Sequence, residues 1–418
     1  MPRIVLTTWG SYGDLFPAVG LALALKARGH VPVVATCEFY RSIVEPLGIG
    51  FHPVPPDVDP NDSALIARLM DPNRGSDVLL GELLAPAIRA SFAAISAAAR
   101  GADLLVSHPA TFATPFVAQA QGIRWVASVL APLSFFSRHD FPALSPMPWT
   151  THLNAFGPGI CGAVLAIARF MTRGMMRPVV ELREELGLAD RGSPLFEGQF
   201  SPLGTLALFP GVLAEPQPDW PPQVCRAGFV SYNGPDPMPP ELLAFLEAGA
   251  PPVAFTLGTS AVGAPGRFFT EAAAACAEAG CRGVLLVGRN PENHPKGPLP
   301  QGVIAVDYAP HQQLFPRAAA VVHQGGMGTT SQALRSGKPQ LIVPHAHDQP
   351  DNAQRVNRLG VSCVCQPRRF RSSRVAAHLR DLLGQAQYRM RAEAVGRAVR
   401  EEDGAAAACD AIEDALRT

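Results

Sequence analysis

Residues 321–352 (VVHQGGMGTTSQALRSGKPQLIVPHAHDQPDN) constrain the fold more than any other stretch of the chain. An apolar run at residues 318–322 ends in His323 and a glycine cluster, and residues 329–335 have helical composition closed by Gly337. The glycines therefore lie between a buried strand and a helix start. Free N–H groups at a helix start point at an approaching anion, with the positive end of the helix dipole behind them. The stretch predicts a phosphate site with His323 as an extra donor, and the contacts expected there are Gly325, Gly326, Met327, Gly328, Thr329 and Thr330.

The second half of this stretch repeats the layout. A strand at residues 340–343 ends in Pro344, and a cluster of polar side chains follows in the next strand-to-helix turn: His345, His347, Asp348, Gln349 and Asn352. Asp348 can accept hydrogen bonds from two sugar hydroxyls while the Gln349 amide donates one. Phosphate and polyol sites on adjacent loops predict a nucleotide-sugar ligand.

The glycine turn does not fit two better-known phosphate motifs. No Lys-Ser or Lys-Thr pair follows the glycines, which excludes a P-loop, and a dinucleotide fingerprint needs wider glycine spacing and a later acid. His345, His347 and Asp348 are residue types that bind metals, but no further ligand cluster is evident, so we expect no metal site. A glycine turn by itself is more often a simple connection between a strand and a helix. The polar loop beside this one is what favours a binding site.

Composition narrows the class of protein. The 418 residues are enough for two domains with their own cores, and 35 basic against 35 acidic residues leave no electrostatic footprint for nucleic acid or an anionic membrane. Charged residues are only 17%, which favours hydrophobic partners. The eight cysteines do not have the paired spacing of metal ligands. The first residues are expected to enter a strand directly, without a signal peptide. The apolar stretches are interrupted before about 18 residues, which is shorter than a membrane-spanning helix. We therefore expect a cytoplasmic protein.

The first half of the chain has the rhythm of a parallel sheet covered on both faces. Expected strands are residues 4–8, 32–36, 50–54, 104–107 and 124–128, and expected helices are residues 17–28, 79–100 and 114–121. Ligands of such sheets bind outside the carboxyl ends of the strands. Residues 10–14 and 108–111 should therefore face one crevice.

The rhythm is lost between residues 134 and 201, where aromatic side chains lie in Pro-rich segments. Apolar pockets with few polar groups are the usual form of small-molecule sites. We expect an apolar acceptor to contact Phe135, Phe136, Phe141 and Trp149. The apolar helical stretch at residues 160–176 is either a core helix, a wall of that pocket or a face that contacts a membrane.

A second sheet series follows the first. A strand at residues 206–209 precedes a segment with linker composition at residues 210–222, and further strands are expected at residues 253–257, 283–287 and 303–306. A helical stretch at residues 392–417 is long enough to fold back on the first domain. We expect domains at residues 1–215 and 236–395, a linker at 216–235 and a returning helix at 396–418.

The motif H-x-G-G-x-G-T-T from His323 and the motif P-x-x-x-D-Q-x-x-N-A from Pro344 resemble the donor-site signature of the family-1 glycosyltransferases. The resemblance implies the α/β GT-B fold, which has two facing Rossmann-like parallel-sheet domains with an interdomain cleft. Residues 10–17, 208–210, 216–221 and 346–353 are similar to the rhamnosyltransferases that make rhamnolipids. That likeness implies a UDP- or dTDP-sugar donor and a lipid-like or other apolar acceptor.

Further roles follow from the resemblance. Thr259 and Ser260 stand where the family has Gly-Ser at the diphosphate, and Gly10, Ser11 and Gly13 join the donor set. Tyr308-Ala-Pro-His311 is similar to the family's Trp-x-Pro-Gln, so Tyr308 is expected to stack on the base and His311 to frame its edge. Such stacking contributes roughly 1–3 kcal/mol, and the two replacements leave uracil or thymine open. The resemblance implies no metal and no cofactor beyond the nucleotide-sugar as co-substrate.

The residue expected to act as the general base is the most unusual feature of the sequence. The family's Gly-His-x-x-Pro is here Gly13-Asp14-Leu-Phe-Pro17, and His108 stands where the family has an orienting Asp. A desolvated carboxylate can serve as base, and a nearby imidazole can order it or relay the proton. The alternative is that Asp14 only caps the helix that begins near Pro17, with His108 a loop residue.

These features predict an inverting, metal-independent glycosyltransferase that acts on a hydroxyl of a small apolar acceptor. A hydrolyzing sugar-nucleotide epimerase shares the architecture but lacks paired carboxylates here, and a non-catalytic nucleotide-sugar sensor is the other alternative. Peripheral contact with the inner face of a membrane, the acceptor and the oligomeric state stay open.

Overall fold

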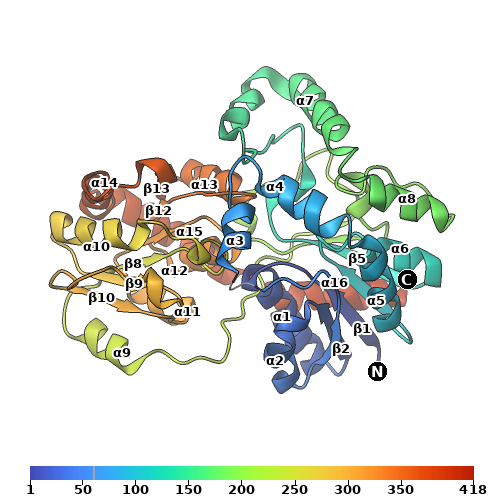
Figure 1. The fold of residues 1–418 in the computed structure, drawn as a ribbon, viewed down its shortest axis with the longest axis horizontal. Helices are drawn as coiled ribbons and strands as arrows, with labels where there is room; N and C mark the ends of the chain where they lie inside the picture. The colour runs from blue at the N-terminus through green and yellow to red at the C-terminus, as the bar shows by residue number, and fades with distance from the viewer. Residues whose placement is uncertain (60–61) are drawn as a thin grey trace. The chain divides into compact units, whose positions relative to one another are not determined.

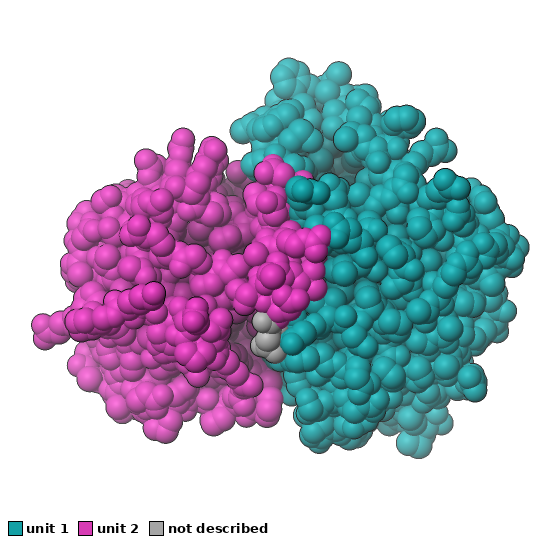
Figure 2. Space-filling view, viewed as in Figure 1, with its two compact units in different colours: residues 1–59, 74–232, 402–418 teal, residues 60–73, 233–401 magenta. Residues whose placement is uncertain are grey.

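The computed structural model describes residues 1–59 and 62–418. The chain divides into two compact units, which Figure 2 colours separately. Unit 1 contains Met1–Asp59, Arg74–Tyr232 and Glu402–Thr418, and unit 2 contains Pro60–Asn73 and Asn233–Glu401.

Unit 1 is built on a seven-stranded parallel sheet in the order β3-β2-β1-β4-β5-β6-β7 (Figure 1). Its strands are β1 (Arg3–Thr7), β2 (Val31–Thr36), β3 (Gly50–Pro53), β4 (Leu104–Ser107), β5 (Arg124–Val129), β6 (Thr205–Ala207) and β7 (Val224–Cys225). The sequence rhythm of the first half predicted the first five of these. The order reverses between β1 and β4, which is the place where ligands bind in open α/β sheets.

The helices of unit 1 are α1 (Tyr12–Ala27), α2 (Arg41–Val44), α4 (Gly75–Asp77), a π-helical segment (Val78–Leu84), α5 (Ile88–Ala98), α6 (Thr114–Gln121), α7 (Gly157–Thr172), α8 (Arg177–Glu185) and α16 (Gly404–Arg417). The expected start of the first helix near residue 17 was wrong, because Ser11 caps α1 more than a turn earlier. The single helix expected at residues 79–100 is broken before α5, where Pro86 can donate no backbone hydrogen bond.

Unit 2 has a six-stranded parallel sheet in the order β10-β9-β8-β11-β12-β13. The strands are β8 (Val253–Thr256), β9 (Gly283–Leu286), β10 (Val303–Val306), β11 (Ala320–His323), β12 (Gln340–Ile342) and β13 (Ser362–Val364). Its helices are α3 (Ser63–Leu69), α9 (Pro240–Glu247), α10 (Phe268–Ala279), α11 (His311–Leu314), α12 (Met327–Ser336), α13 (Gln349–Arg358), α14 (Ser372–Gly384) and α15 (Ala386–Glu401).

Alternate side chains of β8 pack on opposite faces of this second sheet. Val253 and Phe255 join a buried cluster with α10 and α14, whereas Ala254 joins a cluster with α9, α11 and α12 (Figure 1). Burial on both faces explains why the strands of unit 2 are continuous apolar runs. The strand order reverses again, here between β8 and β11.

The Pro-rich segment at residues 216–222 is docked on unit 1. The Trp220 ring stacks on Phe135 with centroids 4.1 Å apart. Asp219 accepts hydrogen bonds from the Ser137 hydroxyl at 2.6 Å and from the Arg138 backbone N–H at 2.8 Å. The segment therefore belongs to the packed body of unit 1, although its composition is typical of a linker.

The long helix expected at residues 392–417 is in fact two helices, α15 and α16, separated by Glu402 and Asp403. Asp403 caps α16 by accepting from the Ala406 N–H at 3.0 Å. The returning element is α16, which packs on α1 and bonds to it through Arg28 and Asp410 at 2.5 Å. A Cβ added at Gly404 would lie 2.6 Å from the Gly228 carbonyl oxygen, so only glycine fits there without movement.

We predict that Gly404→Ala destabilises unit 1 by about 1–3 kcal/mol, because the added methyl overpacks a backbone contact. Gly159→Ala in α7 is the matched control, since nothing lies within 4 Å of its Cβ position. The control should be neutral or stabilising by up to about 1 kcal/mol, because alanine has the better helix propensity. Urea unfolding of both variants, followed by amide exchange of α1 and α16, measures the difference, and equal stabilities would contradict the prediction.

Candidate active site

The turn between β1 and α1 places Asp14 on the carboxyl edge of the first sheet. Asp14 Oδ2 accepts the Ser11 backbone N–H at 2.8 Å, and Ser11 Oγ accepts the Gly13 N–H at 3.1 Å, which forms a reciprocal helix cap. Gly10 has a φ of +139°, and a Cβ there would lie 2.2 Å from Asp14 Oδ2. The sequence Gly10-Ser11-x-Gly13-Asp14 is therefore the local requirement for holding this carboxylate.

His108, which follows β4, meets the carboxylate from the neighbouring strand. Its Nε2 lies 3.4 Å from Asp14 Oδ1. The Ala110 backbone N–H donates to His108 Nδ1 at 3.2 Å, so in the neutral ring the proton is on Nε2 and points at Asp14. The structure thus brings together Asp14 and His108, one residue from each of the two segments expected to face one crevice.

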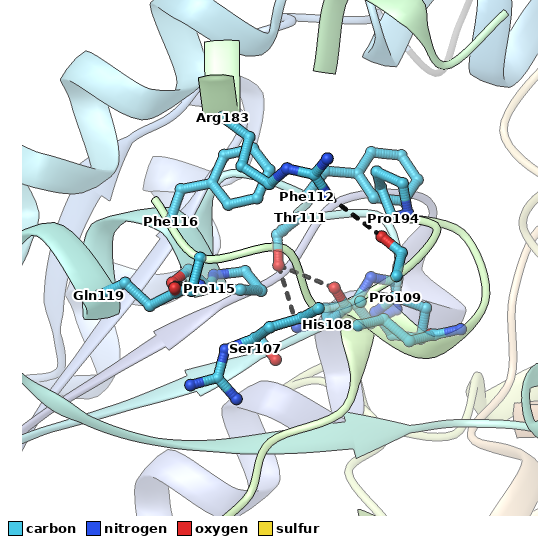
Figure 3. A pocket seen from close by; sticks show the side chains of 15 residues that line it. Ser107, His108, Pro109, Thr111, Phe112, Pro115, Phe116, Gln119, Arg183 and Pro194 are labelled. Atoms are coloured by element: carbon cyan, nitrogen blue, oxygen red, sulfur yellow. Dashed lines mark hydrogen bonds between the residues drawn. The ribbon is translucent and has the colours of Figure 1, made fainter. Parts of the chain in front are cut away.

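Buried hydroxyl groups hold the His108 turn. Thr111 Oγ1 accepts the His108 N–H at 3.0 Å and donates to the His108 carbonyl at 2.8 Å, as the dashed lines in Figure 3 show. Thr7 in β1 hydrogen-bonds to the hydroxyls of Thr111 at 3.0 Å and of Thr114 at 2.8 Å. The imidazole is thus positioned from both strands of the reversal point.

The cavity in Figure 3 lies behind His108, between Phe112, Phe116 and Arg183. Arg183 is bonded to Asp190 and donates to the Gly192 carbonyl at 3.2 Å. The cavity holds about 20 Å³, which is room for about one water molecule. The side chains around this cavity support the histidine turn, and the cavity is too small for a substrate.

The four expected acceptor residues differ in exposure. Phe135 is buried against Trp220 and Phe200, and Phe141 is buried with Cys161 and Leu165. Phe136 packs on Phe196 with centroids 4.7 Å apart. Trp149 is 55% exposed. As the structure stands, Trp149 is the one of the four with most of its ring open to a ligand, and the acceptor role of all four stays a prediction.

In unit 2, α12 begins directly after β11 and its glycines. Gly325 has a φ of +89°, and a Cβ there would meet Ile342 at 3.0 Å and the Gln349 carbonyl at 3.1 Å. No side chain among the described residues caps α12, so its first backbone N–H groups remain available to an anion. Thr330 Oγ1 and Ser331 Oγ are buried without a partner in the described chain. The start of α12 thus has backbone and side-chain polar groups without partners among the described residues.

His323 is not free to act as the extra donor expected at this site. Its Nδ1 accepts the Gly325 N–H at 3.1 Å and its Nε2 lies 2.9 Å from Gln340 Oε1, so both ring nitrogens are occupied. Burial lowers the pKa of His323 to about 4, and the ring is neutral at pH 7. His323 therefore shapes the glycine turn and does not itself neutralise phosphate charge.

The loop after β12 is tied to the same turn. Asn352 Nδ2 donates to the Gly325 carbonyl at 2.9 Å and to Asp348 Oδ2 at 2.7 Å. Gln349 Oε1 accepts the His345 N–H at 2.8 Å, so the side chain closes its own turn, and His347 adopts a positive φ of 57°. Asn352 Oδ1 and His345 Nε2 are buried without partners among the described residues.

Gln324 is a site residue that the sequence did not single out. Its side chain is 3% exposed, and its amide lies against two glycines of different loops. A Cβ on Gly258 would lie 2.2 Å from the amide nitrogen and one on Gly326 would lie 2.8 Å from it. Gly258 leads into Thr259 and Ser260, so Gln324 joins the two loops at the second reversal point. The signal available in the sequence was only a polar residue between His323 and the glycines.

The residues expected to bind the nucleobase, Tyr308 and His311, contact other residues of unit 2. Tyr308 Oη donates to the Asn233 carbonyl at 2.5 Å, and the His311 ring stacks on Phe315 with centroids 4.4 Å apart. Burial lowers the pKa of His311 to about 4, so it is a neutral ring at pH 7. No cluster of three or more His, Cys, Asp or Glu suited to a metal occurs in residues 1–59 and 62–418.

Two family models match the chain. The glycosyltransferase family 28 N-terminal domain matches residues 4–114, and the erythromycin biosynthesis protein CIII-like C-terminal domain matches residues 285–411. O-mycaminosyltylonolide 6-deoxyallosyltransferase of Streptomyces fradiae is 32% identical over 440 residues, covering 100% of this chain and 98% of that protein. Glycosyltransferase GtfE of Amycolatopsis orientalis is 32% identical over 420 residues, covering 98% and 97%. The chain belongs to the GT-B glycosyltransferases.

Solved structures agree on the fold. The kitacinnamycin glycotransferase superposes with a TM-score of 0.72 at 22% identity and 100% coverage of both chains. The glycosyltransferase VinC, solved in complex with dTDP, superposes with a TM-score of 0.68 at 23% identity, also with 100% coverage of both. Two Rossmann-like parallel-sheet units are the GT-B architecture that the donor motif implied.

Membership settles the class of reaction. A GT-B glycosyltransferase moves a sugar from a nucleotide-sugar to an acceptor, so the epimerase and sensor interpretations fall away. The motif of residues 323–352 therefore belongs to a transferase.

We predict that Gly10→Ala lowers turnover of this glycosyltransferase by at least tenfold, because the methyl displaces Asp14. Gly29→Ala, just after the other end of α1, is the control: its φ is +87° and nothing lies within 4 Å of its Cβ position. The control should cost about 1–2 kcal/mol of stability and no turnover. Steady-state rates of the two variants measure the difference. A Gly10→Ala enzyme as active as the control would contradict a role for Asp14 in turnover.

We predict that acidification destabilises unit 2 partly through His345. Burial lowers its pKa from 6.5 to about 4, so its contribution is complete above pH 6.5 and is lost as the pH falls toward 4. The full loss is about 3 kcal/mol. Urea titrations between pH 7 and pH 4.5 should show a shallower decline for His345→Gln, whereas His294→Gln, at an exposed histidine, should keep the wild-type decline. An unchanged decline in His345→Gln would show that another group titrates.

Proposed function

We propose that this glycosyltransferase is an inverting, metal-independent enzyme that moves a hexose or deoxyhexose from a UDP- or dTDP-sugar to a hydroxyl of a small apolar acceptor. The observation that carries the proposal is the Asp14–His108 pair: a carboxylate with one oxygen used in the helix cap and the other 3.4 Å from a protonated imidazole nitrogen. No metal is needed in this scheme, because neutral donors and a helix dipole bind the diphosphate.

In the proposed reaction Asp14 removes the proton of the acceptor hydroxyl as its oxygen bonds to the anomeric carbon. The bond from that carbon to the diphosphate oxygen breaks, and the electron pair leaves with the diphosphate. His108 cannot take the proton through Nδ1, which accepts from Ala110, and its Nε2 already carries one. The geometry therefore favours Asp14 as the base and His108 as the group that orients it.

The diphosphate is assigned to the N-terminus of α12. Residues 326–329 supply backbone N–H groups and the Thr329 and Thr330 hydroxyls lie beside them, whereas the Gly325 N–H already donates to His323. Gln324 packs against Gly258, which leads into Thr259 and Ser260 on the adjacent loop. One lost preorganised donor of this kind costs on the order of 3–4 kcal/mol in comparable sites. The dTDP in the VinC complex supports a thymine or uracil nucleotide. Asp348 is the assigned reader of the sugar hydroxyls, with His347 and Asn352 beside it.

The acceptor is assigned to the aromatic region of unit 1 that contains Trp149. The tylonolide and sterol in the names of two relatives support an apolar alcohol as acceptor. A cytoplasmic enzyme fits eight free cysteines. Rhamnose as the sugar and a glycolipid as the product remain one option within this class.

The test begins with dTDP- and UDP-sugars, which should raise the melting temperature of the protein if they bind its native state. The donor that does so is then incubated in EDTA with a panel of hydroxy-fatty acids, sterols, flavonoids and macrolactones, and products are read by mass spectrometry. Asp14→Asn should lower turnover by about 10²–10⁴ with the thermal shift unchanged, since the amide keeps a capping oxygen but is no base.

His108→Gln separates orientation from proton relay. The glutamine amide can still donate to Asp14, so a purely orienting histidine tolerates this change with a loss of about tenfold or less. Near-wild-type rates in Asp14→Asn would reduce Asp14 to a helix cap. Activity that disappears in EDTA and returns with magnesium would refute the metal-independent scheme.

A further inference from the structure

One helical segment of unit 1 carries a large apolar surface. Pro148–Thr172 runs from a 3₁₀ stretch into α7 and, within the described chain, is the single continuous helix long and apolar enough to cross a membrane; only 11% of its most apolar window is buried. The exposed side chains recur on one side of α7, where Ile167 is 58%, Phe170 72% and Met171 74% exposed. Ile160, Phe156 and Trp149 extend this surface, which we call the α7 face.

The charged side chains within residues 141–180 are all arginines. Residues 141–180 contain no Asp or Glu, although the whole chain has as many acidic as basic residues, and their charged side chains are Arg169, Arg173 and Arg177. Arg169 pairs with Glu197 and Arg177 pairs with Glu181 at 2.7 Å. Arg173 is exposed and has no ion-pair partner among the residues described. Arg173 is therefore the unpaired positive charge beside the apolar surface, while Glu197 and Glu181 neutralise the other two arginines.

The opposite side of α7 is anchored. Cys161 and Leu165 are buried in a cluster with Phe141 and Phe196, and α7 lies at the outer edge of unit 1 in Figure 1. A helix that keeps this contact cannot cross a bilayer, but it can lie along one. A helix with an apolar face, aromatic side chains and flanking arginines has the features of interfacial helices, which insert that face about 5–10 Å into the lipid boundary.

We propose that the α7 face docks on an anionic lipid surface. Apolar insertion of Phe170 and Met171 supplies most of the attraction, and the arginines at the end of α7 favour anionic headgroups by about fivefold per free charge. A second copy of the chain is the other occupant to consider, but two such faces would bring their unpaired Arg173 side chains together, and residues 141–180 contain no carboxylate to compensate them. The proposal concerns binding alone and does not depend on the identity of the sugar or the acceptor.

The test uses the full chain with vesicles of phosphatidylcholine, with and without phosphatidylglycerol. Trp149 is 55% exposed, whereas Trp9 and Trp125 are buried and Trp220 is half-buried on Phe135, so tryptophan fluorescence should shift to shorter wavelength on anionic vesicles. The shift should disappear in Trp149→Phe. Co-sedimentation should fall at least tenfold in Phe170→Ser/Met171→Ser and about fivefold in Arg173→Gln.

Met390→Ser is the control for loss of an exposed apolar side chain, because Met390 is 65% exposed on α15 in unit 2. It should bind vesicles like the wild type. The proposal is overturned if the protein fails to sediment with either vesicle, or if Phe170→Ser/Met171→Ser binds like Met390→Ser. A concentration-dependent dimer in light scattering that this double variant abolishes would also overturn it, by assigning the face to a second copy.

Discussion

The site residues of both units depend on one constraint of parallel sheets. Where the strand order reverses, neighbouring strands send their following segments in opposite directions and leave their carboxyl ends uncovered. In unit 1 the strands are β1 and β4, and the loops after them bring Asp14 within 3.4 Å of His108. In unit 2 the strands are β8 and β11, and the loops after them press the Gln324 amide against Gly258. The same topology thus creates a close contact twice, once between Asp14 and His108 and once between Gln324 and Gly258.

This constraint also explains what the sequence could predict. Buried parallel strands are short apolar runs, and glycine or capping residues follow them, so strands such as β4 and β10 were found with correct bounds. Side-chain partners were harder, because they depend on register between distant segments. The pairing of His323 with Gln340 exists only because β11 and β12 lie side by side. The motif alone therefore suggested a histidine free to donate to a ligand, whereas in the fold both of its ring nitrogens already have partners.

The aromatic segment shows a second limit of sequence reasoning. Phe141 and Trp149 lie eight residues apart in similar Pro-rich surroundings, yet one is buried and the other is largely exposed. Composition predicts that aromatic rings gather there, but it does not tell which rings fill the small core under α7 and which remain outside. The break between α15 and α16, by contrast, could have been predicted from the sequence. Asp403-Gly404 is a recognisable helix start, but the apolar periodicity continues across it and suggested one long helix.

The two interpretations of Asp14 are compatible, because its two oxygens have different partners. The Ser11 N–H binds Oδ2 and fixes the plane of the carboxylate, and the close approach of Gly10 holds it in place. That leaves Oδ1 directed at His108 Nε2, with a third of the Asp14 side chain exposed. A base must be held within a few tenths of an ångström of its productive position, and a helix cap is one of the most rigid ways to hold a short side chain. The cap therefore supplies the orientation that the proposed base would require. The histidine lies beside the carboxylate on the neighbouring strand, and its own turn is held by Ala110 and Thr111.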